Sequence, residues 1–441
     1  MHYLTEDPSL KAYILCRFAR QSEIYQSWMD ACPIPCEVID TYVPDWQVPR
    51  DAAIVITHMH YRWEEIHALR DIYQKGRVPV LILSDGILEY RNTWEHPDLA
   101  DGAMFQPLIG HKLACIGRGQ ARIIESWGNP GKAEVIGLPR LDRDLDRTPS
   151  PIHQDGPFRL LIATANTPAF NDQQRETVIE SLSQIKQRLT VNPQVNHRPV
   201  QITWRLTDNL EQSIGLPFVD DTGLEPAEPP PLSEEIDASD AVITTPSTLY
   251  LESALKQRPT ALLDFHNSPH FVPAAWMLNA PKHLNWILQE LADPPPPKML
   301  YQKTVLHDNL ECNTPAKPRM LELIQTMVEH GQHARASGKP IELPQRIVSD
   351  PDRGFTRVES EFDTTRLYPE NAAFQNQELH QLQGELSQVI KRLDTLPRDL
   401  AEKNQYITLL LEQRDEMRLK ITELRARIQK LRKMLGIKPK S

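Results

Sequence analysis

Short apolar runs alternate with amphipathic segments over the first three quarters of the chain. Apolar strands separated by helices are typical of a mostly parallel, doubly wound sheet. Residues 1–145 are therefore predicted to form a Rossmann-like domain. Its predicted strands are 12–18, 52–57, 78–83, 112–116 and 134–136, and its first predicted helix is 21–30.

A second series of the same kind follows a break marked by Pro149, Pro151 and Pro157. Residues 146–333 are predicted to form a second Rossmann-like domain, which gives an α/β fold with two doubly wound sheets. Ligands of such folds bind at the carboxyl ends of the strands, so residues that follow strands are the candidates for chemistry. The predicted strands are 158–163, 200–206, 241–244 and 260–263. The predicted helices are 171–189, 249–257, 284–292 and 318–330.

The pattern changes after this series. Residues 334–375 are rich in Pro, Ser and charge without periodicity, which predicts a flexible linker. In 376–437, apolar residues recur at spacings of three and four, which predicts a coiled coil. Ile at the a positions and Leu at the d positions favour a parallel homodimer through 386–435, with a break at Pro397. A single helix that packs back on the body is the alternative.

The formal net charge of −10 argues against a nucleic-acid-binding protein. This charge is uneven, because 414–441 holds ten Lys or Arg and three Asp or Glu, a net of +7, and the remainder carries −17. The basic end is therefore expected to meet an anionic membrane surface or an acidic partner.

The five cysteines show neither paired spacing nor zinc spacing, which indicates reduced thiols in a cytoplasm. No apolar run approaches the roughly 20 residues that span a bilayer, and the N-terminus lacks the apolar stretch of a signal peptide. The protein is expected to be soluble and cytoplasmic, and peripheral at the inner membrane face if its basic end binds lipid.

The segment 238–264 carries the strongest indication of a ligand site. A buried strand is broken by Pro246, and Ser247 or Thr248 can cap the helix that follows. A strand, a hydroxyl-bearing turn and a helix N-terminus together favour a bound anion. Glu252, one turn into the helix, can accept hydrogen bonds from a ribose diol. The segment is predicted to be a nucleotide-diphosphate pocket; an ordinary strand–helix–strand unit is the alternative.

Other polar residues follow strands of the same predicted sheet. Asn166 and Thr167 can bind a sugar or a phosphate, or else cap the next helix. Arg205 presents a guanidinium fork suited to a phosphate, or else forms a surface ion pair.

The first domain offers candidates for a general base. His58 and His60 follow one strand, and Asp85 and Glu89 follow the next. A His or a carboxylate at a strand end can remove a proton from a sugar hydroxyl. Asp85 is the favoured base and His60 the next. A turn cap at Asp85 and a packing role for one histidine are the alternatives.

Other chemistries lack their motifs, since the sequence has no Gly-x-Ser-x-Gly elbow, Walker A loop or His-Glu-x-x-His. Gly117 and Gly119 follow a strand without a third glycine and are interpreted as a tight turn. Asp142 and Asp144 have the spacing of a metal motif but follow Pro139, and they are interpreted as polar hinge residues.

The two-sheet pattern, the 135–142 hinge and the 245–252 turn resemble GT-B-fold glycosyltransferases, most of all the bacterial capsule-polysaccharide and teichoic-acid-type transferases. In that family the second domain holds the nucleotide-diphosphate donor at this turn, and an acidic residue at the place of Glu252 contacts the ribose. The resemblance implies that the base and the acceptor come from the first domain and that no metal or other cofactor is needed. It covers roughly 12–330 and lacks a glycine-rich loop after the first strand, where Arg-Phe-Ala-Arg stands at 17–20.

The sequence thus predicts a glycosyltransferase that moves a sugar from a nucleotide-sugar donor to a saccharide or lipid-linked acceptor in cell-surface polysaccharide synthesis. A nucleotide-sugar 2-epimerase shares the fold and the serine-bearing turn and is the enzymatic alternative. The non-enzymatic alternative is a catalytically silent GT-B-like body that serves as a coiled-coil scaffold.

Overall fold

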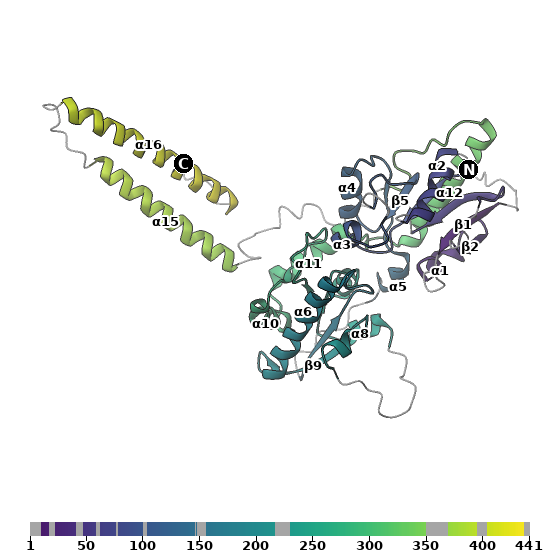
Figure 1. Cartoon of the computed structure of the whole chain (residues 1–441), viewed down its shortest axis with the longest axis horizontal. Coiled ribbons are helices and arrows are strands. Elements are labelled where there is room, and N and C mark those ends of the chain that lie inside the picture. Colours follow the sequence, from purple (N-terminus) through teal and green to yellow (C-terminus); the bar gives the residue numbers. More distant parts are fainter. Residues whose placement is uncertain are drawn as a thin grey trace. The chain divides into compact units, whose positions relative to one another are not determined.

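The chain divides into two compact units, Met1–Thr356 and Arg357–Ser441. In the part of the chain that the structure describes, the larger unit holds two six-stranded sheets and the smaller holds two long helices (Figure 1). The computed structural model describes residues 10–16, 23–40, 47–58, 62–75, 78–99, 104–145, 147, 156–216, 230–349, 369–394 and 404–435.

The first sheet is parallel throughout, in the order β2-β1-β3-β4-β5-β6. Its central strands are apolar and buried along their length, as expected for a parallel sheet covered on both faces. The strand order reverses between β1 and β3, which is the switch point of this sheet. The elements are β1 (Lys11–Cys16), α1 (Glu23–Met29), β2 (Cys36–Asp40), β3 (Ala52–Thr57), α2 (Trp63–Lys75), β4 (Val80–Leu83), α3 (Tyr90–Trp94), β5 (Lys112–Cys115), α4 (Arg118–Ser126), β6 (Ala133–Val135), η2 (Pro139–Leu141) and α5 (Asp142–Leu145).

The second sheet has the order β12-β11-β10-β7-β9-β8 and is parallel except for the β8–β9 pair. Its strand order reverses between β7 and β10, so the second switch point lies there. The elements are β7 (Phe158–Ala163), α6 (Asp172–Val191), β8 (Gln194–Val195), β9 (Arg198–Arg205), α7 (Leu210–Ser213), α8 (Leu232–Ala238), β10 (Ala241–Thr244), α9 (Leu249–Leu255), β11 (Thr260–Leu263), β12 (Trp276–Leu278), η3 (Pro281–His283), α10 (Leu284–Ala292) and α11 (Pro296–Asn309).

The predicted fold class, two doubly wound Rossmann-like sheets followed by C-terminal helices, is confirmed. Some elements were not predicted. β2 and β12 are short edge strands with little periodicity to reveal them. α11 begins with prolines at its first positions. A proline is tolerated there because the first-turn N–H groups of a helix have no partner within the helix.

The long helix α12 (Ala316–Ser337) packs on the first sheet, although it follows the second sheet along the chain. Met320, Leu323 and Met327 lie in the same core as Ile14 and Ile54. The range 146–333, predicted as one domain, therefore ends in a helix that packs against the first sheet. The periodicity of a helix shows that one face is apolar, and it does not show which sheet covers that face.

The range 334–375, predicted as a flexible linker, begins inside α12 and ends inside the next helix. After α12, Leu343, Ile347 and Val348 also pack against the core of the first sheet. Residues 350–368 lie outside the described part of the chain.

The smaller unit is a pair of antiparallel helices, α15 (Pro369–Asp394) and α16 (Asn404–Met434), which Figure 1 shows side by side. The start of α15 meets the end of α16, because Leu379 packs with Ile428 and Leu431 and because Glu378 pairs with Arg427 at 3.6 Å. The apolar seam predicted for a parallel coil therefore packs within one chain. A heptad pattern defines an apolar stripe without naming its partner, so the homodimer stays a prediction. Pro397 lies outside the described residues.

Candidate functional site

The loops after β7 and β10 lie side by side at the switch point of the second sheet. The Ala165 N–H donates to Thr245 Oγ1 over 2.8 Å and ties the two loops together. Asn166 and Thr167 follow at once and are exposed. α6 is capped by Asn171, whose side chain accepts a first-turn N–H at 2.9 Å. Capping therefore does not explain Asn166 and Thr167, which stand where a ligand of this sheet is expected.

The predicted donor turn joins β10 to α9. Pro246 is buried, while Ser247 and Thr248 are half-buried. Ser247 Oγ accepts the N–H of Leu249, the first residue of α9, at 3.3 Å, whereas the N-cap residue of this helix is Thr248, whose side chain makes no capping hydrogen bond. Thr248 instead accepts the N–H of Ile87, at 3.1 Å, from the loop that follows β4 in the first sheet. The donor turn thus touches the half of the unit that was predicted to supply the base.

The loop after β4 is held in place where it meets this turn. Gly86 lies so close to Thr248 that an added Cβ would collide with the threonine hydroxyl. Its carbonyl accepts from Ser84 Oγ at 3.0 Å and from Gln120 Nε2 at 3.2 Å. Asp85, the favoured base, is exposed next to this contact. The structure therefore brings the sequence candidates Asp85 and Thr248 to the same junction between the two sheets.

His58 follows β3 at the switch point of the first sheet. The Tyr25 hydroxyl lies 2.5 Å from its Nδ1 and accepts its backbone N–H at 3.1 Å. The same hydroxyl donates to the Leu15 carbonyl at 3.5 Å. The hydroxyl has a single proton for the Leu15 carbonyl and for Nδ1, so the tautomer of His58 decides whether Nδ1 donates to this oxygen or accepts from it. Burial lowers the pKa of His58, against the raising effect of the Asp85 carboxylate. His60 lies outside the described residues.

Two other candidates already hold charged partners. Glu89 accepts a backbone N–H of α3 at 2.7 Å as its N-cap and pairs with Arg91 at 2.9 Å. Arg205 pairs with Glu235 on α8 at 2.6 Å, which agrees with the ion-pair alternative. A phosphate would have to compete with Glu235 for this guanidinium.

The predicted hinge residues have structural roles. Arg140 pairs with Glu252 at 2.6 Å, so the carboxylate expected at a ribose faces the hinge. Both carboxylate oxygens of Asp142 accept first-turn N–H groups of α12, at 2.7 and 2.8 Å, in agreement with a polar hinge residue. Gly117 allows the backbone of Asn309 to approach the start of α4, which gives this glycine a packing role.

The loop after β11 adds polar residues that the sequence analysis did not select. Asp264 is buried and accepts the Ser268 N–H at 3.0 Å, with His270 Nε2 at 3.1 Å from the same carboxylate. His266 Nε2 is buried and has no hydrogen-bond partner among the described residues. Burial and the Arg91 charge lower the pKa of His266. Its place directly after the predicted strand 260–263 was the available signal.

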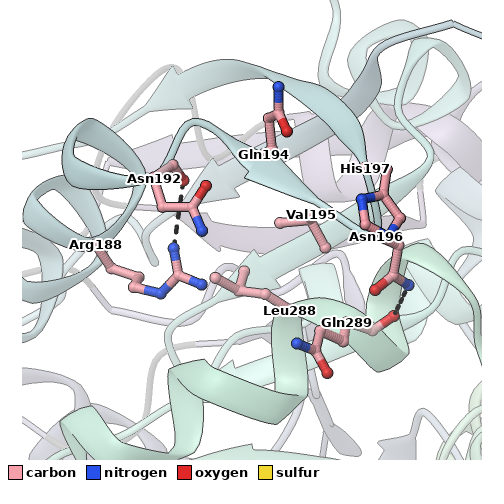
Figure 2. Close-up of a pocket in the computed structure, with 8 residues that line it drawn as sticks. All are labelled: Arg188, Asn192, Gln194, Val195, Asn196, His197, Leu288 and Gln289. Atoms are coloured by element: carbon pink, nitrogen blue, oxygen red, sulfur yellow. Dashed lines mark hydrogen bonds between the residues drawn. The ribbon is translucent and has the colours of Figure 1, made fainter.

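A pocket of about 230 Å³ lies away from these loops (Figure 2). It is formed by the end of α6, the tight β8–β9 turn and α10, at the amino end of β9. Ligands of open parallel sheets bind at the carboxyl ends of the strands, so this pocket does not define the site. Its lining residues are Arg188, Asn192, Gln194, Val195, Asn196, His197, Leu288 and Gln289.

Among the described residues, no three His, Cys, Asp or Glu side chains gather as they would around a metal ion. In the same part of the chain, no helix combines the length and the apolar character needed to cross a membrane.

Comparison with known proteins gives matches in structure alone. No protein-family model matches the sequence, and no curated protein matches it. A solved structure of S. aureus MnaA with UDP is 12% identical, with a TM-score of 0.48, over 76% of this chain and 100% of the other. The wall teichoic acid polymerase TagF is 13% identical, with a TM-score of 0.44, over 73% and 90%. A UDP-GlcNAc 2-epimerase of Methanocaldococcus jannaschii is 11% identical, with a TM-score of 0.48, over 72% and 99%. The sheet orders of this chain show, independently of these comparisons, two doubly wound, Rossmann-like sheets in one compact unit.

Proposed function

We propose that this protein is a glycosyltransferase that uses a nucleotide-diphosphate sugar. The proposal rests on the contact between Thr248 and the 84–87 loop, which joins the switch point of the second sheet to the strand ends of the first. Two opposed strand edges are where a GT-B-like fold receives its two substrates. The acceptor is expected to be a saccharide or a lipid-linked saccharide of the cell surface.

The donor's diphosphate lies against Asn166, Thr167 and Ser247 in this proposal. These residues offer an amide and two hydroxyls at the switch point, and the exposure of Asn166 and Thr167 leaves them accessible. Glu252 reaches the ribose only if it exchanges its partner Arg140 for the diol. Arg205 likewise reaches a phosphate only by leaving Glu235.

His58 is the proposed general base, with Asp85 beside it. The acceptor hydroxyl gives its proton to Nε2 of the neutral imidazole, and its oxygen attacks the anomeric carbon as the bond to the nucleotide diphosphate breaks. The Asp85 carboxylate stabilises the imidazolium that forms, because its negative charge opposes the lowering of the His58 pKa by burial. The proposal requires the tautomer in which Nδ1–H donates to the Tyr25 hydroxyl, because Nε2 is then free to accept the proton.

Thermal unfolding with UDP-, GDP-, CDP- and CMP-linked sugars tests the donor site, because a ligand that binds only the folded state raises its melting temperature. Product analysis with the stabilising nucleotide then separates the enzymes, since an epimerase returns an isomerised nucleotide sugar and a transferase releases the nucleotide. Stabilisation by none of the four classes would favour the silent scaffold.

Substitution of His58 tests the base. We expect His58→Gln to lower turnover by about 10²–10⁴-fold while donor binding is retained. Tyr25→Phe should lower turnover by a smaller factor, because His58 loses the hydroxyl that contacts its Nδ1. Because burial lowers the pKa of His58, its imidazole stays neutral below the ordinary value of about 6.5, and the acid limb of kcat/KM should lie below that pH. His380→Gln, an exposed histidine in α15, is the matched control. Full activity in His58→Gln would exclude this assignment.

A further inference from the structure

Four aromatic side chains form a continuous row beside the junction of the two sheets. Tyr90 and Trp94 lie on α3, with ring centroids 6.5 Å apart. Trp94 meets Trp127, which ends α4, at 5.9 Å, and Trp127 meets Phe271 at 5.6 Å. Phe271 belongs to the loop after β11, so the row joins α3 and α4 of the first sheet to a loop of the second. We call these four residues the aromatic row.

The aromatic row is open to solvent at Trp94, which is 41% exposed, while its other members are half-buried. The Trp94–Trp127 and Trp127–Phe271 ring pairs pack edge to face, an arrangement that holds each ring against its neighbour. Trp94 therefore presents a large apolar surface on a rigid support. A ring held in this way beside the junction can pack against the apolar face of a ligand.

Polar groups stand in the same segments as the rings. Glu89 and Arg91 flank Tyr90 in the chain, and His266 lies five residues before Phe271. Arg91 and Glu89 act electrostatically on His266, so these groups of the two halves lie near one another. The buried Nε2 of His266 has no hydrogen-bond partner among the described residues, and a buried polar atom of this kind is stabilised by a ligand that supplies one.

We infer that the aromatic row, with His266, binds the saccharide acceptor. A pyranose has an apolar face of C–H groups and a rim of hydroxyls, so one face packs on Trp94 while a hydroxyl supplies the missing partner of His266. The 84–87 loop, which contacts the donor turn, leads directly into the segment that carries Glu89 and Tyr90. An acceptor on the row would thus lie next to the proposed transfer site. This inference rests on the proposed function and adds the location of its second substrate.

Direct glycan binding tests the row without any nucleotide. The full chain is applied to an array of oligosaccharides from bacterial capsules and wall polymers, and the strongest ligand is then titrated in solution. We expect Trp94→Ala to weaken that affinity by about tenfold or more, with a smaller loss in Trp94→Phe, which keeps a ring. His266→Gln should also weaken it.

Trp286 on α10 provides the matched control, because it is 40% exposed and lies outside the row. We expect Trp286→Ala to change glycan affinity by less than about twofold, and Trp94→Ala to keep the thermal shift given by the nucleotide sugar. Equal effects of the two tryptophan variants, or no glycan binding at all, would overturn the inference. A Trp94→Ala chain that loses nucleotide binding instead would assign the row to the donor. If the unaltered chain binds glycan but no nucleotide sugar, the proposed glycosyltransferase function is wrong, while the inference that the aromatic row binds a saccharide is retained.

Discussion

The contact between Gly86 and Thr248 can be tested by a double-mutant cycle. Gly86→Ala places a Cβ on the Thr248 hydroxyl, and overpacking of this kind costs about 1–3 kcal/mol of unfolding free energy. Thr248→Ala removes the acceptor of the Ile87 N–H and should cost about 0.5–1.5 kcal/mol. In the double variant the colliding oxygen is gone, so the loss should be close to that of Thr248→Ala alone.

The expected coupling is therefore about 1–3 kcal/mol in the stabilising direction. Urea denaturation measures it, with comparison of midpoints at an unchanged slope. Gly384→Ala is the matched control, since Gly384 lies on α15 with no atom near its Cβ position. Combined with Thr248→Ala, it should give additive effects. If Gly86→Ala and Thr248→Ala also add within about 0.5 kcal/mol, the two residues do not touch and the junction described here is wrong.

One buried ion pair and the C-terminal segment lead to three other predictions. Lys112 and Glu134 are buried and 2.6 Å apart, so Glu134→Gln should lower the free energy of unfolding by about 3–5 kcal/mol in urea, while a double substitution to Met should recover most of it. A loss below about 1 kcal/mol would contradict this. Sedimentation of the full chain separates two packings of the same seam: the homodimer predicted through 386–435 gives a dimer, whereas the pairing of α15 with α16 within one chain allows a monomer, and a monomer at all micromolar concentrations would exclude the homodimer. Vesicle flotation should show binding to anionic lipid through 414–441, and equal binding to neutral vesicles would remove the electrostatic explanation.

The sequence by itself determined the strands near the candidate site. The predicted strands 52–57, 158–163, 241–244 and 260–263 match β3, β7, β10 and β11 at both ends. These strands are buried over nearly their whole length, so they appear as short, mostly apolar runs bounded by polar or turn residues. The predicted start of the helix after β10, Leu249, is also the first residue of α9.

Partners far apart in the chain were decided by the tertiary structure alone. Thr248 bonds to Ile87, which is 161 positions away, and Glu252 pairs with Arg140 across the hinge. Only the tertiary structure shows that His266 lies near Arg91 and that its buried Nε2 has no hydrogen-bond partner among the described residues. A sequence shows which side chains carry polar groups, and the packing of the two sheets determines which of those groups meet.

The same reason explains α12 and the tail. The apolar stripe of 318–330 was visible in the sequence, but its packing against Ile14 and Ile54 of the first sheet was not. The heptads of 376–437 indicated helices, while the pairing of Leu379 with Ile428 in one chain depended on how that chain reverses. Periodicity is a local property that fixes the type of element and its apolar face, whereas the surface that covers this face is fixed by contacts between distant segments.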